Sequence, residues 1–233
     1  MFRTEYPRDV ARVSGPDAAS YLQSQLSQDI RAMQVGDTRW SFLLQPTGKV
    51  DVLLRIRRTA DEEFVLDTDA GFGETMVARI NRFKIRVKAD VELLDWPCVA
   101  VRGADAARLD GAVPSWGSGY DLFGSDAPAD LPAGSADDLL AARIDAAWPA
   151  MGAEIVPGET IPAETGITDV AVSFTKGCYP GQELVERMDS RAVTAPRLLQ
   201  RLDAAEAERL GARVTSRHGD VVLAYVPRSA LAH

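Results

Sequence analysis

The sequence predicts an α+β protein built from two related halves and a small C-terminal β unit. Three patterns support this fold class: a β-hairpin near the N-terminus, helix-start signals directly after strand-like segments, and a short motif that recurs in the second half. The expected boundaries are residues 1–95 for the first half, 96–190 for the second half and 191–233 for the C-terminal unit.

The first half opens with a strand at residues 10–13 and a helix directly after it. Residues 14–17 (SGPD) place capping residues, a proline and an acidic residue where a helix N-terminus favours them. Apolar residues then alternate over 40–44 and 50–56 on either side of a Pro-Thr-Gly turn, which predicts a β-hairpin. The remaining elements expected here are a strand, a helix and a strand at residues 63–66, 72–83 and 85–94.

A short sequence from the first half recurs in the second half. Residues 13–19 (VSGPDAA) match residues 101–107 (VRGADAA) at an offset of 88 residues, which is 101 minus 13. Two unrelated helix starts would also produce such a short match. Because the match places the same strand-to-helix junction in both halves, we favour a structural repeat.

The rest of the chain contains a loop-rich segment, two helices and the C-terminal unit. Residues 111–138 are rich in Gly, Ala, Ser, Pro and Asp, so we expect mobile loops there. Ser135 and Asp138 resemble a capping box for a helix over 136–147. A further helix is expected to begin at Gln182. The C-terminal unit should contain the segment 198–202, a short helix around residues 204–210 and a strand at residues 221–226.

The composition is that of an ordinary globular protein with an acidic balance. Its 233 residues are 46% hydrophobic and 26% charged, with a net charge of −8 and a sequence pI near 4.9. This charge argues against broad nucleic-acid binding, although cations cluster at residues 79–88 and 187–201. Two cysteines and two histidines are too few for an intrachain zinc or iron–sulfur site, so we expect no bound metal. The N-terminus lacks a signal-peptide pattern and no run reaches transmembrane length, which predicts a cytoplasmic protein without membrane contact.

The two cysteines have different surroundings in the sequence. Cys98 lies in an apolar, strand-like run that is typical of a buried structural residue. Cys178 instead lies between Gly177 and Gly181, two residues after Lys176 and shortly before the next expected helix. The two glycines permit backbone angles that a side chain would forbid. The lysine charge and the helix dipole both favour thiolate over thiol, which predicts an exposed, reactive Cys178 rather than a small buried one.

The cysteine segment carries a family resemblance. Its string Lys-Gly-Cys-Tyr-x-Gly-Gln-Glu resembles the signature of the folate-binding YgfZ-type proteins, relatives of the aminomethyltransferase (T-protein) of the glycine cleavage system. The matching positions are Lys176, Gly177, Cys178, Tyr179, Gly181, Gln182 and Glu183. Further similar stretches lie at residues 13–18, 21–30, 42–50, 143–154 and 161–164. The resemblance implies the paired α+β subdomains of the aminomethyltransferase folate-binding fold, with the family's longer C-terminal β-barrel trimmed to a small unit.

The resemblance implies tetrahydrofolate as the bound cofactor. In the T-protein relatives, the glutamate that matches Glu164 binds the pterin ring, because a carboxylate accepts two parallel hydrogen bonds from a ring N–H and an exocyclic amine. Arg143 and Asp51 are further folate contacts by resemblance. A solvated loop carboxylate is the alternative for Glu164. The cations at 79–88 are either a solvated face or a contact for the anionic polyglutamate tail of folate.

The resemblance also implies a role in assembling or repairing iron–sulfur clusters in client proteins, with Cys178 as the reactive group. Its thiolate would act on folate-borne carbon, on a cluster or in redox exchange, and all three stay open. A folate-dependent aminomethyltransferase is the first alternative, but it needs two adjacent aspartates in the hairpin, and Val52 follows Asp51 here. A non-catalytic binding module is the second alternative. The expected partners are folate and iron–sulfur client proteins or assembly factors.

Overall fold

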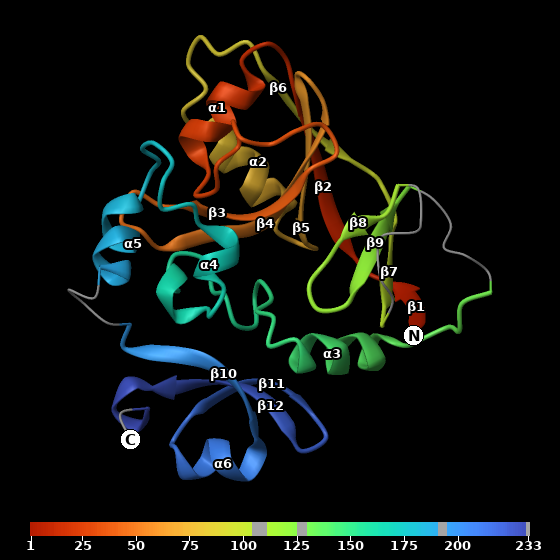
Figure 1. The fold of residues 1–233 in the computed structure, drawn as a ribbon, viewed down its shortest axis with the longest axis vertical. Helices are drawn as coiled ribbons and strands as arrows, with labels where there is room; N and C mark the ends of the chain where they lie inside the picture. The colour runs from red at the N-terminus through yellow and green to blue at the C-terminus, as the bar shows by residue number, and fades with distance from the viewer. Residues whose placement is uncertain (104–110, 125–129, 191–194, 232–233) are drawn as a thin grey trace. The chain divides into compact units, whose positions relative to one another are not determined.

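The structure is a computed structural model, and it describes residues 1–103, 111–124, 130–190 and 195–231. The mixture of helices and sheets confirms the α+β fold class (Figure 1). The chain forms two compact units that interleave along the sequence. The five-stranded unit contains residues 9–95 and 150–195, and the two-sheet unit contains residues 1–8, 96–149 and 196–233.

The five-stranded unit is built on a sheet with the strand order β3-β4-β5-β2-β6. The predicted hairpin joins β3 (Thr38–Leu44) to β4 (Val50–Ala60), and β5 (Glu63–Asp69) pairs with β4. On the other side, β2 (Arg8–Ser14) pairs with β6 (Asp90–Leu94) in antiparallel register. The alternation in the sequence therefore predicts this hairpin correctly.

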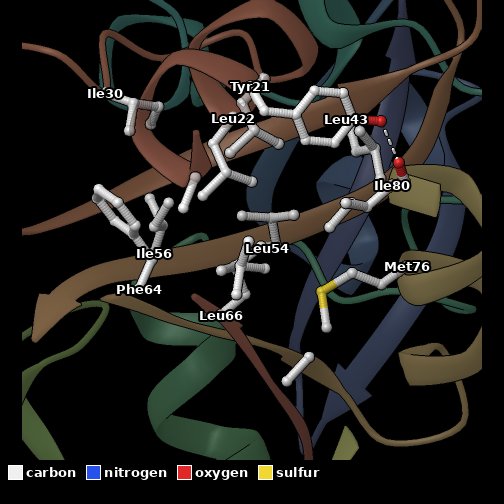
Figure 2. Packing of buried hydrophobic residues seen from close by; sticks show 14 of the residues in the cluster. Tyr21, Leu22, Ile30, Leu43, Leu54, Ile56, Phe64, Leu66, Met76 and Ile80 are labelled. Carbon is white, nitrogen blue, oxygen red and sulfur yellow. Dashed lines mark hydrogen bonds between the residues drawn. The ribbon is translucent and has the colours of Figure 1, made fainter. Parts of the chain in front are cut away.

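Two helices cover the hydrophobic face of this sheet. They are α1 (Ala18–Gln25) and α2 (Gly73–Asn81), and both contribute to one core with alternate residues of β4. Figure 2 shows Leu54 of β4 among side chains from both helices. The Tyr21 hydroxyl donates a hydrogen bond to the Ile80 carbonyl, so α1 is tied to the last turn of α2. Three short helices complete the unit: η2 (Pro162–Glu164), α4 (Thr168–Ala171) and α5 (Gln182–Asp189).

The two-sheet unit contains a four-stranded sheet, β1-β7-β9-β8, and a three-stranded sheet, β10-β12-β11. The first sheet consists of β1 (Phe2–Glu5), β7 (Cys98–Arg102), β8 (Val113–Pro114) and β9 (Gly119–Phe123). The second consists of β10 (Arg197–Asp203), β11 (Arg213–His218) and β12 (Val221–Pro227). The helices of this unit are α3 (Ala136–Asp145), α6 (Ala204–Arg209) and η3 (Arg228–Ala230).

Helix α3 begins with the predicted capping box. The Ser135 hydroxyl accepts a hydrogen bond from the Asp138 backbone N–H at 3.1 Å, and the Asp138 carboxylate accepts one from the Ser135 backbone N–H at 2.8 Å. From this start, α3 packs against β1, β11 and β12. Ile144 joins Leu223 and Tyr225 in a small core, so α3 connects the two sheets of its unit.

Two element predictions are wrong. The segment at 111–138 is not simply loop, because β9 lies inside its sheet with Tyr120 and Leu122 buried. The strand predicted at residues 85–94 begins only at Asp90, because Arg86 adopts a left-handed backbone conformation with φ +59°. Strand β11 was not predicted, because its residues are mostly polar and exposed and show no alternation.

The division of the chain also differs from the predicted sequential halves. Strand β1 pairs with β7, and α3 packs on the C-terminal sheet, so the end of the chain joins the middle in one unit. The repeated helix start at 104–107 lies outside the described residues. Among the described helices, none is both long enough and apolar enough to cross a membrane.

Candidate functional site

Cys178 lies in a loop that joins α4 to α5 (Figure 1), here called the cysteine loop and defined as residues 174–181. The Cys178 side chain is exposed to solvent. The next residue, Tyr179, is buried, and burial together with the nearby Glu186 carboxylate raises the pKa of its hydroxyl to about 12. The loop therefore anchors one aromatic side chain and presents the neighbouring thiol outward.

Lys176 ties the cysteine loop to the end of α1. Its ammonium donates hydrogen bonds to the backbone carbonyls of Gln23 and Leu26, which are carbonyls that the helix end leaves without intrahelical partners. It also lies 4.8 Å from the centre of the Tyr179 ring. Burial lowers the pKa of Lys176 from 10.5 to about 8. Nearby charges have smaller effects on this pKa, some raising it and one lowering it. Lys176 is thus a structural anchor as well as a cation near the thiol.

The other side of the cysteine loop contacts the β3–β4 hairpin. Gly181 has φ +82°, and a Cβ atom placed on it would lie 2.4 Å from the Gln45 carbonyl oxygen. A Cβ atom placed on Gly48 of the hairpin turn, φ +83°, would lie 2.5 Å from the Leu184 Cβ and 3.1 Å from the Gly181 carbonyl oxygen. Gly177 has open space around it and no positive φ. The predicted need for glycine is therefore correct at Gly181 and wrong at Gly177.

Helix α5 begins at Gln182, with Gly181 at its N-cap, so Cys178 precedes the helix start as expected. The Gln182 side-chain oxygen accepts a hydrogen bond from the Tyr179 backbone N–H at 3.1 Å, which fixes the end of the loop. Glu183 pairs with Arg187 one turn later at 2.7 Å. The Gln182 contact therefore ties the loop to the first turn of the helix, whereas the exposed Glu183–Arg187 pair lies within the helix.

Asp51 is held by two partners inside the five-stranded unit. Its carboxylate oxygens accept hydrogen bonds from the Gln45 side-chain amide at 2.7 Å and from Arg79 Nε at 3.1 Å. Arg79 also donates to the Leu44 carbonyl at 2.6 Å and is buried, so it does not belong to an exposed cation cluster. Because a helix repeats every 3.6 residues, the apolar Met76 could have placed Arg79 on the buried face.

Glu164 ends the short helix η2 and is buried, with 4% of its surface exposed. The segment before it pairs with the start of β4, where the Val50 N–H donates to the Thr160 carbonyl and the Gly158 N–H donates to the Val50 carbonyl, both at 2.8 Å. Helix α5 packs against η2. These contacts bring the cysteine loop to the same region of the unit as Glu164 and Asp51, which follows Val50 in β4.

Arg143 belongs to the two-sheet unit. Its guanidinium donates to the Trp148 carbonyl at 2.9 Å and to the Ser216 hydroxyl at 2.6 Å, which connects the end of α3 to β11. These contacts give Arg143 a role in the packing of its own unit. Its role as a folate contact stays a prediction.

The chemistry of this region fits tetrahydrofolate at one position. A buried carboxylate such as Glu164 matches the row of N–H donors on a pterin edge, and Pro162 and the turn that follows fix its backbone. Asp51 fits less well as a proton acceptor, because both of its oxygens already accept hydrogen bonds. Over the described part of the chain, no group of three or more His, Cys, Asp or Glu side chains is arranged to hold a metal ion.

Comparisons with known proteins agree with this architecture. Residues 9–114 match the GCVT N-terminal domain. The crystal structure of the glycine cleavage system aminomethyltransferase T from Bartonella henselae has the same fold, with a TM-score of 0.72 over 98% of this chain and 79% of that one, at 18% identity.

Curated relatives extend the comparison over most of the chain. An iron-sulfur cluster assembly factor IBA57 homolog from Neurospora crassa is 30% identical over 226 residues, covering 82% of this chain and 51% of the relative. The tRNA-modifying protein YgfZ from Vibrio vulnificus is 26% identical over 220 residues, covering 84% and 67%. The chain thus spans about half to two thirds of the length of these relatives. The GCVT N-terminal domain match, these relatives and the shared fold together support a YgfZ-type relative of the aminomethyltransferases.

Proposed function

We propose that this protein binds tetrahydrofolate and assists the assembly or repair of iron–sulfur clusters, with Cys178 as its reactive group. The names of the IBA57 relatives support the cluster-assembly role. The observation that carries the proposal is the exposed Cys178 thiol on a loop held at both ends. A held loop keeps a thiol in one position, which favours reaction with a partner over a role in packing.

One thiolate cannot hold an iron–sulfur cluster alone. Clusters of this kind are ordinarily held by four cysteine thiolates, and the residues of the five-stranded unit include no other cysteine and no histidine. Cys178 would therefore supply one ligand to a cluster whose other ligands come from a partner protein. Such a shared cluster suits transient transfer or repair.

Aminomethyl transfer is disfavoured at the hairpin. Val52 occupies the position of the second aspartate of the aminomethyltransferases, and it is fully buried in the core beneath α1 and α2. A carboxylate at this position would lose its hydration in an apolar core. The surroundings of Val52, and not only the residue itself, are therefore unsuited to an aspartate. Asp51 is hydrogen-bonded on both oxygens. This arrangement offers no second carboxylate for proton transfer at a folate nitrogen.

Folate binding is tested by calorimetry with tetrahydrofolate. Glu164→Gln should weaken binding by about 1.5–3 kcal/mol, or roughly 10- to 150-fold, because the amide keeps one acceptor oxygen and turns the other into a mispaired donor. The exposed Glu159→Gln is the matched control and should bind like the wild type. Equal affinities for the wild type and Glu164→Gln would remove Glu164 from a pterin site.

The role of Cys178 is tested in cells that lack the endogenous gene. Complementation by the wild type and by Cys98→Ser should restore the activity of a [4Fe–4S] enzyme under aerobic growth, whereas Cys178→Ser should not. Immunoblots must show equal amounts of all three proteins. If Cys178→Ser restores activity fully, the protein acts as a non-catalytic binding module and the proposed reactive cysteine is wrong.

A further inference from the structure

The segment after α2 exposes apolar side chains among cations. It is defined as residues 82–88 and is called here the basic–apolar loop. Ile85 is 78% exposed and Phe83 is 43% exposed, which is unusual for large apolar residues of one short segment. The four cations of the loop are Arg82, Lys84, Arg86 and Lys88.

This loop is built and held, not left loose. The Lys84 ammonium donates to the Ala89 carbonyl at 2.8 Å. The backbone N–H of Lys88 donates to the Asp17 carboxylate at 2.8 Å, and the Lys88 carbonyl accepts from the Asp17 N–H at 3.2 Å. Between these contacts, Arg86 has the left-handed φ of +59°, a conformation that a non-glycine residue keeps only where its surroundings enforce it. The protein therefore maintains a strained turn that presents Ile85 to solvent.

Helix α1 connects this loop to the cysteine loop. Asp17, the N-cap of α1, bonds Lys88, and the carbonyls of Gln23 and Leu26 at the other end bond Lys176. The eight residues of α1 rise about 12 Å. The two loops thus mark the two ends of one short helix.

The cysteine loop adds apolar surface of its own. Phe174 is 42% exposed and lies four residues before Cys178, and Val170 of α4 is 48% exposed. An ordinary protein interface covers about 800 Å² on each partner, a patch roughly 30 Å across, which is wider than α1 is long. A partner that reaches Cys178 can therefore also cover Ile85.

We propose that the basic–apolar loop is the docking surface for an acidic protein that exchanges its cluster at Cys178, with Ile85 as the apolar anchor. This inference rests on the proposed function. The chain has a net charge of −8, so the residues outside the loop carry −12, which is −8 minus the four positive charges. The loop is thus a positively charged patch on an acidic protein. Charge complementarity favours a partner whose carboxylates surround an apolar pocket.

Other anionic ligands fit this loop less well. A polyglutamate tail or a phosphate backbone has no apolar group to cover Ile85. The ring of Phe83 lies 5.0 Å from the Arg79 guanidinium and 5.7 Å from that of Arg82, so its faces are engaged by cations and are poor stacking platforms for a base. A folded protein matches both the aliphatic anchor and the charges.

The partner is identified by site-specific photo-crosslinking in cells. A benzoylphenylalanine residue replaces Ile85 in one variant and Val35 in a matched control, because Val35 is a 55% exposed apolar residue of the same unit. The expected result is one dominant protein cross-linked from position 85, with an acidic sequence and a cluster-binding site, and no such adduct from position 35. Adducts only to nucleic acid, to lipid, to a second copy of this chain, or to nothing would overturn the proposal.

Binding of the purified pair then tests the residues. Ile85→Ser and Arg86→Glu should each weaken affinity at least tenfold, and the wild-type affinity should fall as salt rises, whereas Leu93→Ser, a 48% exposed control, should bind normally. Thermal melting checks that each variant is folded. Wild-type affinity in both loop variants, or competition by pentaglutamyl tetrahydrofolate, would overturn the docking surface. Normal docking by Cys178→Ser with full cluster transfer would instead refute the proposed function and leave the docking surface standing.

Discussion

Cys98 and Cys178 are the same residue in opposite surroundings. Cys98 begins strand β7, lies opposite Phe123 of β9 and is 6% exposed. Cys178 lies in a loop with its side chain in solvent. The strand holds Cys98 through backbone ladders that would hold any small residue. The loop holds Cys178 through its neighbours, so its position depends on Lys176 and Gly181 rather than on regular structure.

This difference teaches how a fold keeps a thiol exposed without leaving it mobile. The buried Tyr179, the bonded ammonium of Lys176 and the close backbone contact at Gly181 each fix one point of the cysteine loop. None of these contacts uses the sulfur. The thiol is therefore free to react while the backbone that carries it stays in place.

The largest expected effect is the ratio of the two alkylation rates. With iodoacetamide at neutral pH, Cys178 should react at least about 100-fold faster than Cys98, because Cys98 must wait for an opening of its sheet. Peptide mass spectrometry resolves the two adducts, and the two rates should converge in denaturant. Similar slow rates in the native protein would show that Cys178 is as protected as Cys98.

Glycine substitutions separate the two sides of the cysteine loop. Gly181→Ala should lower the free energy of unfolding by about 3 kcal/mol, because the new Cβ meets backbone atoms of Gln45 and the φ of +82° is strained for alanine. Gly177→Ala is the matched control. It should change the free energy of unfolding by less than about 0.5 kcal/mol, since open space surrounds that position.

Urea titrations measure both values. A Gly181→Ala variant as stable as the Gly177→Ala variant would mean that the loop does not press on the hairpin.

Alanine at the cysteines tests which one contributes to packing. Cys98→Ala should destabilise the protein by about 1 kcal/mol, because a buried sulfur atom is lost from a packed sheet. Cys178→Ala should be neutral within about 0.5 kcal/mol. Chemical denaturation under reducing conditions gives both numbers. The reverse order would assign the structural role to Cys178.

Local patterns predict much of the five-stranded unit. The hairpin follows from the alternation at 40–44 and 50–56. Residues 14–17 predict the helix but not its first residue, because α1 begins at Ala18 with Asp17 at its N-cap rather than Ser14 or Gly15. The capping box at Ser135 and the start of α5 at Gln182 are equally local signals. Each of these features depends on residues that are close together in the sequence, so a local pattern is sufficient to predict it.

The parts that sequence patterns missed depend on contacts between distant residues. Lys176 bonds carbonyls about 150 positions earlier in the chain, and Arg79 reaches Asp51 on another element. The interleaved units depend on the pairing of β1 with β7. The cysteine motif points to Cys178 by its residue types, but the loop's anchors become visible only when the chain is folded.

A further expected effect concerns the Lys176 anchor and pH. Its pKa is about 8 in the folded protein and near 10.5 when unfolded, so between these pH values the unfolded chain binds more protons. Burying the charged ammonium opposes folding fully below pH 8, and this penalty is relieved as the pH rises toward 10.5. The wild type should therefore gain stability across this window relative to Lys176→Met, which has no titrating group at this position.

Lys176→Arg is the control that separates titration from hydrogen bonding. Its guanidinium keeps the cation and the donors for Gln23 and Leu26, but it does not lose its proton below pH 12. Both variants should thus lose the pH-dependent gain, while only Lys176→Met also loses the hydrogen bonds at every pH. Urea midpoints at pH 7.5 and pH 10 provide the comparison. Parallel pH profiles for all three proteins would mean that the ammonium is solvated, and the cysteine loop would then be held from the hairpin side alone.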